Sequence, residues 1–380
     1  MRVLAACSLG GAGHLNPLLP FLAAATRRGD DVLVVGPPAL RGLVESAGVP
    51  FRPGGEPPEE TVASIRERLP LVSREEASAL ANRELFGRLA TAAMLRPLEQ
   101  ACAEWHPDLL LREPCEYASA IVAPRLGIPL AQVAISLAEA EAGSIRTAAP
   151  ALEEHRQGLV AELLESPYLT RFPASLDPSP FPTTIRFREA AGRTHAPLPD
   201  WWAGSDAPLV YATFGTVLGH MSIASRVYRA ALRAVADLDA RILLTVGRRF
   251  DLSELGPAPA NVHVERWVDQ ARVLAEADLV ACHGGSGTAL GALAAGLPLV
   301  LVPLFADQFE NSRRIADAGA GTVVGQGHFG EEDAPLLREQ IERVLAESSF
   351  AQQARSIADE IAAAPSVDRT LDDLSPATRA

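Results

Sequence analysis

Lysine is absent from this sequence of 380 residues, so all 34 basic residues are arginines. Chemistry that needs an ε-amine is therefore excluded, including Schiff-base catalysis, pyridoxal-phosphate enzymes, the lysine-containing phosphate-binding loop and the strand lysine of protein kinases. Cysteine is scarce. The four cysteines show no CxxC spacing, and a chain of this size needs no disulfide scaffold. We expect them to be reduced, buried and structural.

Net positive charge is also missing, because 34 basic residues against 47 acidic ones give a formal charge of −13. An acidic surface repels phosphate backbones and anionic lipid, and the sequence shows no local basic patch. We therefore expect neither nucleic acid nor a membrane as a partner. The N-terminal residues contain no cleavable signal and no apolar run that could cross a bilayer, which predicts a soluble, cytoplasmic protein.

The length fits two globular domains, and a strand–helix alternation occurs in both halves. In the first half we expect strands at 2–7, 31–36, 108–112 and 130–135, with helices at 15–28, 39–47, 85–105 and 116–126. In the second half we expect strands at 208–213, 241–246, 262–264, 279–282, 298–302 and 321–324, with helices at 223–237, 269–276, 287–295 and 309–318. The pattern predicts two doubly wound parallel sheets of the α/β class.

Proline-rich sequence separates the two halves. We place the domains at 1–195 and 208–364, with a linker at 196–207 and a polar tail at 365–380. Residues 331–363 are expected to form two helices. Residues 53–84 and 136–170 do not follow the alternation, and long irregular connections of this kind are usually binding loops or lids.

Two polar groups follow strands of the first half. The segment from Gly10 to His14 is placed where a helix start favours an anion or a polar ligand. A dinucleotide site is disfavoured, because the spacing is not GxGxxG and the second strand lacks a carboxylate at its end. His14 could act as a base or cap the helix. Glu113 follows the strand at 108–112, so it could orient the His14 ring or be a plain loop carboxylate.

The most specific motif is the segment from His283 to Thr288, which again joins a strand end to a helix start. Its glycines allow close backbone approach, and its two hydroxyls add donors, which predicts a diphosphate site without lysine. Asp307 and Gln308 follow another strand end and could bind sugar hydroxyls or begin a helix. The only Asp-x-Asp sequence, at Asp237 and Asp239, is expected to be surface charge.

Taken together, these segments resemble the bacterial glycosyltransferases of the GT-B fold that glycosylate natural products. The resemblance spans nearly the whole chain and is closest to actinobacterial enzymes that move a deoxysugar from TDP to a polyketide, macrolide or enediyne-type aglycone. It rests on Gly13–Pro17, Phe214–Thr216, Glu265–Val268, His283–Thr288, Gly296–Pro298, Asp307–Gln308 and Gly319–Gly321.

The resemblance implies two Rossmann-like domains that face a cleft, the first binding the acceptor and the second the nucleotide sugar. His14 matches the catalytic base. Glu113 takes the place of the orienting carboxylate, which is usually Asp. The donor would be held by Trp267 and Val268 at the nucleobase, by Thr216, His283, Gly285, Ser286, Gly287 and Thr288 at the diphosphate, and by Asp307 and Gln308 at the sugar. Asp269 stands where the family usually has Pro, and we expect it to start a helix.

The implied activity is an inverting, metal-independent transfer of a sugar from a TDP- or UDP-sugar to a hydroxyl of a hydrophobic small molecule, with no cofactor. A homodimer is compatible with the resemblance. The alternatives are a nucleotide-sugar epimerase or hydrolase, and a non-catalytic partner that activates another glycosyltransferase. A non-catalytic partner should have lost the diphosphate motif, which this chain keeps.

Overall fold

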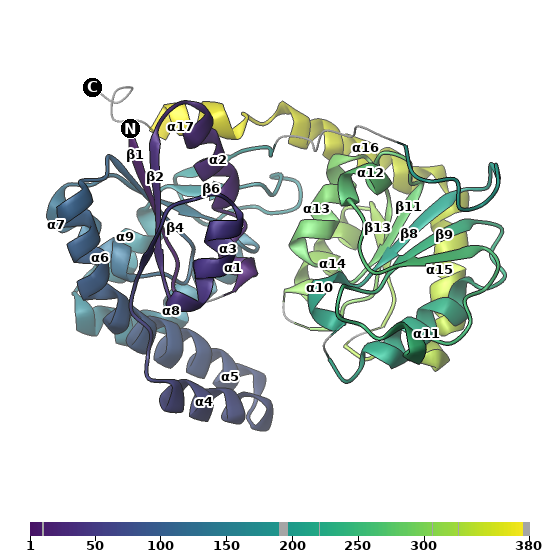
Figure 1. Cartoon of the computed structure of the whole chain (residues 1–380), viewed down its shortest axis with the longest axis horizontal. Helices are drawn as coiled ribbons and strands as arrows, with labels where there is room; N and C mark the ends of the chain where they lie inside the picture. The colour runs from purple at the N-terminus through teal and green to yellow at the C-terminus, as the bar shows by residue number, and fades with distance from the viewer. Residues whose placement is uncertain (10, 190–196, 220, 306, 326, 375–380) are drawn as a thin grey trace. The chain divides into compact units, whose positions relative to one another are not determined.

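The computed structural model describes residues 1–380 except 10, 190–196, 220, 306, 326 and 375–380, and except the side chains of 70, 74, 216 and 217. The chain divides into two compact units (Figure 1). Unit 1 comprises Met1–Ala190 with Ala364–Ala380, and unit 2 comprises Ala191–Ala363. Each unit is described by itself.

Unit 1 contains a seven-stranded sheet in the order β3-β2-β1-β4-β5-β6-β7, and every pairing in it is parallel. The strands are β1 (Arg2–Ala6), β2 (Asp31–Gly36), β3 (Phe51–Pro53), β4 (Leu109–Arg112), β5 (Leu130–Val133), β6 (Tyr168–Thr170) and β7 (Thr184–Arg186). The helices of the expected alternation are α1 (Ala12–Leu15), α2 (Leu19–Arg27), α3 (Arg41–Ser46), α6 (Thr91–Trp105) and α7 (Ala118–Leu126).

Burial on both faces explains why the strands of unit 1 are apolar throughout. Along β1, Val3 and Ala5 face a core that includes residues of α2, whereas Leu4 and Ala6 face a second core that includes residues of α6 and α7. The strand order changes direction at the junction of β1 and β4. In doubly wound sheets, ligands bind beyond the carboxyl ends of the strands at such a junction.

Unit 2 contains a six-stranded parallel sheet in the order β10-β9-β8-β11-β12-β13, and its order changes direction between β8 and β11. Its strands are β8 (Leu209–Thr213), β9 (Arg241–Thr245), β10 (Val262–Glu265), β11 (Leu279–Cys282), β12 (Leu299–Leu301) and β13 (Gly321–Val323). Its helices are α10 (Gly215–Leu218), α11 (Ala224–Val235), α12 (Gln270–Leu274), α13 (Ser286–Ala294), α14 (Gln308–Asp317), α15 (Ala334–Ala346) and α16 (Ser348–Ala363). The two sheets confirm the expected fold class.

The two segments that we expected to be irregular are largely helical, so that prediction is wrong. Residues 53–84 contain α4 (Glu59–Arg68), α5 (Arg74–Ala79) and the start of the π-helical segment η3 (Leu80–Ala90). Residues 136–170 contain α8 (Ala138–His155), α9 (Leu159–Glu165) and β6. The apolar pattern is weak in α4, which buries only Val62 and Ile65, and Pro150 interrupts the pattern of α8.

Within the expected polar tail at 365–380, the structure forms helix α17 (Val367–Leu374), which packs on α2 in unit 1. Val367, Leu371 and Leu374 are buried in the same core as Phe21. Two ion pairs, from Arg27 to Asp368 and from Arg28 to Asp372, lie at its exposed side. The short apolar repeat was hidden among charged residues.

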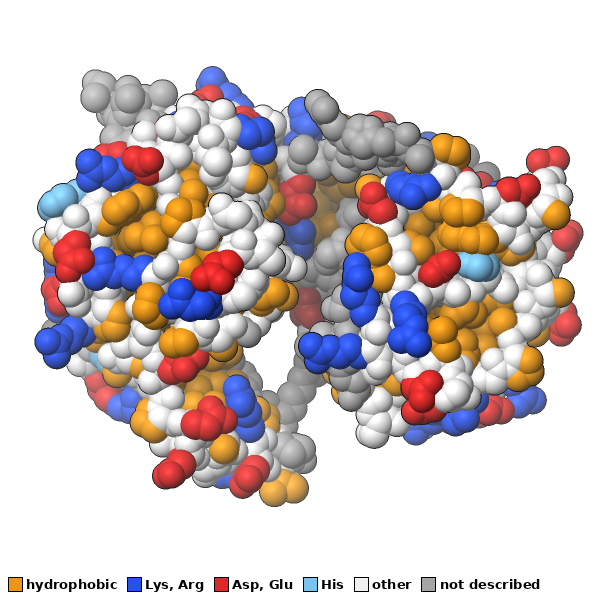
Figure 2. Space-filling view, in the orientation of Figure 1, with side chains coloured by type: hydrophobic (Ala, Val, Ile, Leu, Met, Phe, Trp, Pro, Cys, Tyr) orange, Lys and Arg blue, Asp and Glu red, His pale blue; other side chains and the backbone are white. Residues whose placement is uncertain are grey.

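Acidic and basic side chains are interspersed on the visible face of each unit (Figure 2). Among the described residues, no helix combines the length and apolar character required to cross a membrane.

Candidate functional site

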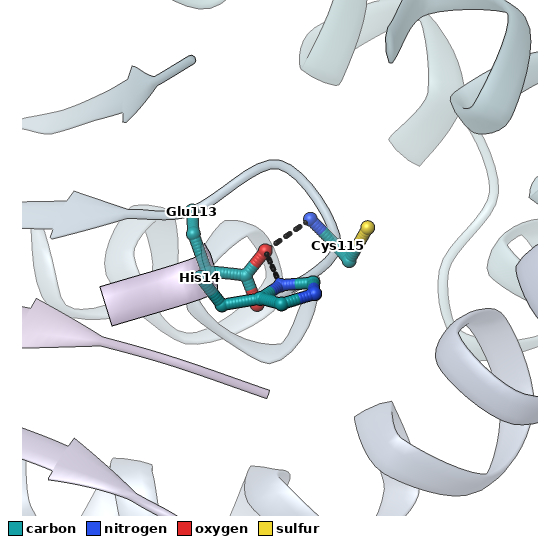
Figure 3. Close-up of side chains that lie close together, drawn as sticks. All are labelled: His14, Glu113 and Cys115. Carbon is teal, nitrogen blue, oxygen red and sulfur yellow. Dashed lines mark hydrogen bonds and ion pairs between the residues drawn. The ribbon is translucent and has the colours of Figure 1, made fainter. Parts of the chain in front are cut away.

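In unit 1, His14 and Glu113 meet at the junction of β1 and β4 (Figure 3). The pairing of Ala6 with Arg112 sets the two strand ends side by side, so the residues that follow them converge. His14 lies on the four-residue helix α1, which ends before α2 begins, whereas we had expected one helix at 15–28. Its Nδ1 lies 3.0 Å from Glu113 Oε2. The expected pairing of these two residues is thus present in the geometry.

Glu113 is fully buried, and both of its carboxylate oxygens are hydrogen-bonded. Oε1 accepts from the amide of Ser8 at 2.9 Å and from the Ser8 hydroxyl, and Oε2 accepts from the amide of Cys115 at 2.7 Å. These donors hold the side chain of Glu113, which is one methylene longer than the Asp that the resemblance implies at this position. Ser8 was missed from the sequence. Its position just beyond β1 was the available signal, since Glu113 was found by the same reasoning.

The two groups shift each other's ionisation. Burial alone would lower the pKa of His14, but the charge of Glu113 and the hydrogen bond to it raise that pKa above its ordinary value. Burial would raise the pKa of Glu113, yet the His14 charge and the bonds from His14 and Ser8 lower it. An ionised carboxylate only accepts hydrogen bonds, so neutral His14 carries its proton on Nδ1. The lone pair is then on Nε2, the position of a general base.

Two further side chains border His14. The Phe86 ring, on η3, lies with its centroid 5.9 Å from that of the imidazole. Cys115 is half-buried, unlike the other three cysteines, and all four are unpaired. His14, Glu113 and Cys115 present nitrogen, oxygen and sulfur atoms within 4.8 Å of one another, a donor set that a zinc ion accepts. A second such group, His328 with Glu332 and Asp333, lies in unit 2 near the surface.

In unit 2, His283 follows β11 and lies beside the glycines at the start of α13. A Cβ at Gly285 would come within 2.5 Å of His283 Nε2, and one at Gly215, which follows β8, within 2.8 Å. Gly284 has φ +81°, and a Cβ there would come within 2.3 Å of Ser312 Oγ. Only glycine fits these positions, so no side chains of these residues cover the backbone amides at the start of α13. Burial lowers the pKa of His283, which favours neutral imidazole.

Ser286, Asp307 and Asn311 form a hydrogen-bonded group beside these glycines. Ser286 Oγ donates to Asp307 Oδ2 at 3.0 Å, and Asn311 Nδ2 donates to the same oxygen at 3.1 Å and to the Gly284 carbonyl at 3.0 Å. Asn311 was not singled out from the sequence, although it lies one helical turn after Asp307. The Gln308 side chain is buried, and its Oε1 accepts from the amides of Leu304 and Phe305 at 2.9 and 3.1 Å.

The remaining predicted donor residues lie around the same sheet edge. Gly287 is exposed, and Thr288 Oγ1 accepts from Gln270 Nε2 at 3.3 Å. Trp267 follows β10 and is 53% exposed, with the Arg248 guanidinium 4.5 Å from a ring centroid, and Val268 is half-buried. The side chain of Thr216 lies outside the described part of the chain.

Two smaller expectations are confirmed. Asp269 caps α12 by accepting from the amide of Ala271 at 3.1 Å, so the departure from the usual Pro starts the helix as expected. Asp237 and Asp239 follow α11 and are exposed, and Asp237 pairs with Arg338 at 3.2 Å. Both aspartates are surface charge.

Comparison with known families matches most of the chain to the two domains of one family. The erythromycin biosynthesis protein CIII-like family has an N-terminal domain that matches residues 23–215 and a C-terminal domain that matches residues 229–375. The chain belongs to this family. The relatives below are glycosyltransferases, so the family member described here is a glycosyltransferase as well.

Two curated relatives match this glycosyltransferase over almost its entire length. Elloramycin glycosyltransferase ElmGT of Streptomyces olivaceus is 34% identical, over 96% of this chain and 94% of that protein. L-demethylnoviosyl transferase of Streptomyces niveus is 28% identical, over 96% and 95% respectively. The resemblance to glycosyltransferases of natural-product biosynthesis is therefore confirmed.

Solved structures agree on the fold. The glycosyltransferase SnogD of Streptomyces nogalater is 26% identical, with a TM-score of 0.77 over 98% of both chains. The spinosyn rhamnosyltransferase SpnG, solved with thymidine diphosphate, is 24% identical, with a TM-score of 0.79 over 98% of this chain and all of that one. These matches confirm the GT-B fold.

Proposed function

We propose that this glycosyltransferase moves a deoxysugar from a TDP-sugar to a hydroxyl group of a polyketide-type aglycone with inversion at the anomeric carbon. The observation that carries the proposal is the contact between His14 Nδ1 and the buried carboxylate of Glu113, which leaves His14 Nε2 as a base. The donor class is supported by SpnG and VinC, which were solved with thymidine diphosphate. A natural-product acceptor is supported by the relative named as elloramycin glycosyltransferase ElmGT.

In the proposed reaction, His14 Nε2 takes the proton of the acceptor hydroxyl while its oxygen bonds to the anomeric carbon. The bond from that carbon to the diphosphate oxygen breaks, and the electron pair leaves with the nucleoside diphosphate. Glu113 stabilises the imidazolium that forms, because its negative charge lies 3.0 Å from Nδ1. A single displacement by one base inverts the anomeric carbon.

The leaving diphosphate would be held at the start of α13 by the amides of Gly285, Ser286 and Gly287, with His283 and the hydroxyls of Ser286, Thr288 and Thr216. Amide donors and the helix dipole favour negative charge there. Trp267 and Val268 would bind the nucleobase, and Asp307 and Gln308 the sugar. We propose that no metal ion takes part.

The test is a transfer assay with a TDP-deoxysugar and an aromatic polyketide aglycone, with the product followed by mass spectrometry. Proton NMR of the product, compared with the donor, reports the anomeric configuration. We expect a single added deoxysugar with the opposite configuration. Retained configuration would contradict the single displacement, and transfer only from UDP-sugars would contradict the donor assignment. As a control, Glu139→Gln, which changes an exposed carboxylate on α8, should transfer at the wild-type rate.

A further inference from the structure

Arg112, the last residue of β4, is a fully buried guanidinium directly before Glu113. Its Nη1 donates to three backbone carbonyls that converge on it, those of Glu113 at 3.1 Å, Pro114 at 3.0 Å and Glu116 at 2.9 Å. A buried carbonyl left without a donor is costly, so these bonds wrap residues 113–116 around the guanidinium. Arg112 therefore determines the path of the loop that carries Glu113.

The same loop supplies one of the donors to Glu113. Its tight turn, closed by the Glu116 amide on the Glu113 carbonyl at 3.1 Å, directs the amide of Cys115 onto Glu113 Oε2. That oxygen is the one that contacts His14 Nδ1. The position of the carboxylate against the imidazole thus depends on the loop, and the loop depends on Arg112.

A second set of bonds fixes Arg112 itself. Its Nη2 donates to Oε1 of Gln132 on β5, and Gln132 Nε2 lies 3.4 Å from Glu141 Oε2. Glu141 Oε1 accepts from the amides of Ile135 at 2.8 Å and Ser136 at 2.6 Å, in the loop after β5. The chain of contacts joins the loops after two neighbouring strands. These contacts add to the backbone hydrogen bonds that join the two strands.

We propose that Arg112 is a positioning residue for the pair formed by His14 and Glu113. It acts through the loop 113–116, and its own side chain is fully buried. Its role in catalysis rests on the proposed function, whereas its effect on the ionisation of His14 does not. The titratable groups that surround the pair, besides Arg112, are Cys7, Cys115, Glu116, Tyr117 and Glu141.

The test compares Arg112→Met, which keeps an unbranched but shorter side chain and removes the charge and donors, with Arg112→Lys. The three donors of a lysine ammonium can replace Nη1 at the three carbonyls, but not the bond to Gln132. In Arg112→Met we expect kcat/KM to fall about 10- to 100-fold, the cost of a displaced catalytic group. Because Glu113 no longer holds the imidazolium, the acid limb of the pH profile moves to lower pH. Arg112→Lys should recover most of the wild-type kcat/KM and most of the wild-type position of the acid limb.

Arg186 provides the matched control. It also holds two backbone carbonyls in unit 1, those of Phe172 and Asp177 at 3.0 and 2.9 Å, but away from the pair. Arg186→Met should lower thermal stability and leave the acid limb unchanged. A merely structural Arg112 would behave in the same way once the rate at each pH is divided by the folded fraction measured at that pH.

The readout independent of activity is the pKa of His14 followed by NMR, with its resonance assigned by its loss in His14→Gln. We expect a lower pKa in Arg112→Met than in the wild type. An unchanged pKa and an unchanged acid limb in folded Arg112→Met would overturn the inference. If that variant does not fold, Gln132→Leu takes its place. We then expect the pKa of His14 to be lowered by a smaller amount, and an unchanged pKa would overturn the inference. Turnover that survives His14→Ala would overturn the proposed function alone.

Discussion

The two units of this enzyme each carry a histidine where the strand order of the sheet changes direction, but the surroundings of the two histidines differ. His14 lies beyond β1 and His283 beyond β11. His14 contacts a buried carboxylate and has a raised pKa, whereas His283 lies among glycines and has a lowered one. The neighbours of each histidine, rather than the fold, determine whether the site suits a base or an anion.

The largest expected effect comes from removing the histidine of unit 1, which tests whether His14 is the base. We expect His14→Ala to lower the transfer rate by about 10² to 10⁴, the usual contribution of a general base. A transfer assay under donor and acceptor saturation measures it. His155→Ala is the control, because His155 lies at the end of α8, where its Nε2 is 3.2 Å from the Gly87 carbonyl oxygen. Equal rates in the two variants would remove His14 from the mechanism.

Glu113→Gln tests whether the carboxylate sets the ionisation of His14. We expect a loss of roughly tenfold or more in kcat at neutral pH, since the imidazolium loses its counter-charge. Glu113 raises the pKa of His14, and His14 must be neutral to act as a base. Wild-type activity therefore falls as pH falls through that raised pKa, and in the variant this acid limb moves to lower pH. A pH profile with an unmoved limb would show that Glu113 does not control the base.

Glu141→Gln concerns the stability of unit 1. Burial raises the pKa of Glu141 to about 8, whereas in the unfolded chain it titrates near 4.5. The resulting stabilisation is complete below the unfolded value and is lost as pH rises to about 8, an effect of up to about 5 kcal/mol at about 1.4 kcal/mol for each pKa unit. Urea unfolding at pH 5 and pH 9 should show a smaller pH difference in this variant than in the wild type. Glu139→Gln, at an exposed site on the same helix, should keep the wild-type difference.

The smallest expected effect is that of chelation. If amide donors and side chains at the start of α13 stabilise the leaving diphosphate, then EDTA should change the rate by less than about twofold. A rate that collapses with EDTA and returns with Mg²⁺ would contradict this account of unit 2. The donor set of His14, Glu113 and Cys115 would then be the first candidate for the metal.

Much of this arrangement could be predicted from the sequence, because parallel strands that are buried on both faces form apolar runs with polar residues just beyond them. His14, Glu113 and His283 were found from that pattern. The same reasoning did not reach Ser8, because a serine after a strand is too common a signal to single out. The role of Arg112 could not be predicted for a different reason. A charged residue inside a strand gives no indication that the loop after it will wrap around its side chain.

The helical segments of unit 1 were the main error. Their helices rest on contacts far apart in sequence, which a local pattern does not contain. A Cβ at Gly87 would lie 3.2 Å from Ala148 and 3.3 Å from Ala151, so the close approach of η3 and α8 depends on small residues on both. Small side chains carry little apolar periodicity, and the segments therefore seemed irregular.

Calorimetric titration of TDP into His14→Ala and Gly285→Ala tests most directly the claim that the base and the donor site belong to separate units. A methyl group at Gly285 would come within 2.5 Å of His283 Nε2 and disturb the proposed donor site, whereas Gly143→Ala, with no atom within 4 Å of the new methyl, is the control. The account predicts wild-type TDP affinity in His14→Ala and Gly143→Ala, and a loss of about tenfold or more in Gly285→Ala. Equal loss of TDP affinity in His14→Ala and Gly285→Ala, or wild-type affinity in Gly285→Ala, would contradict it.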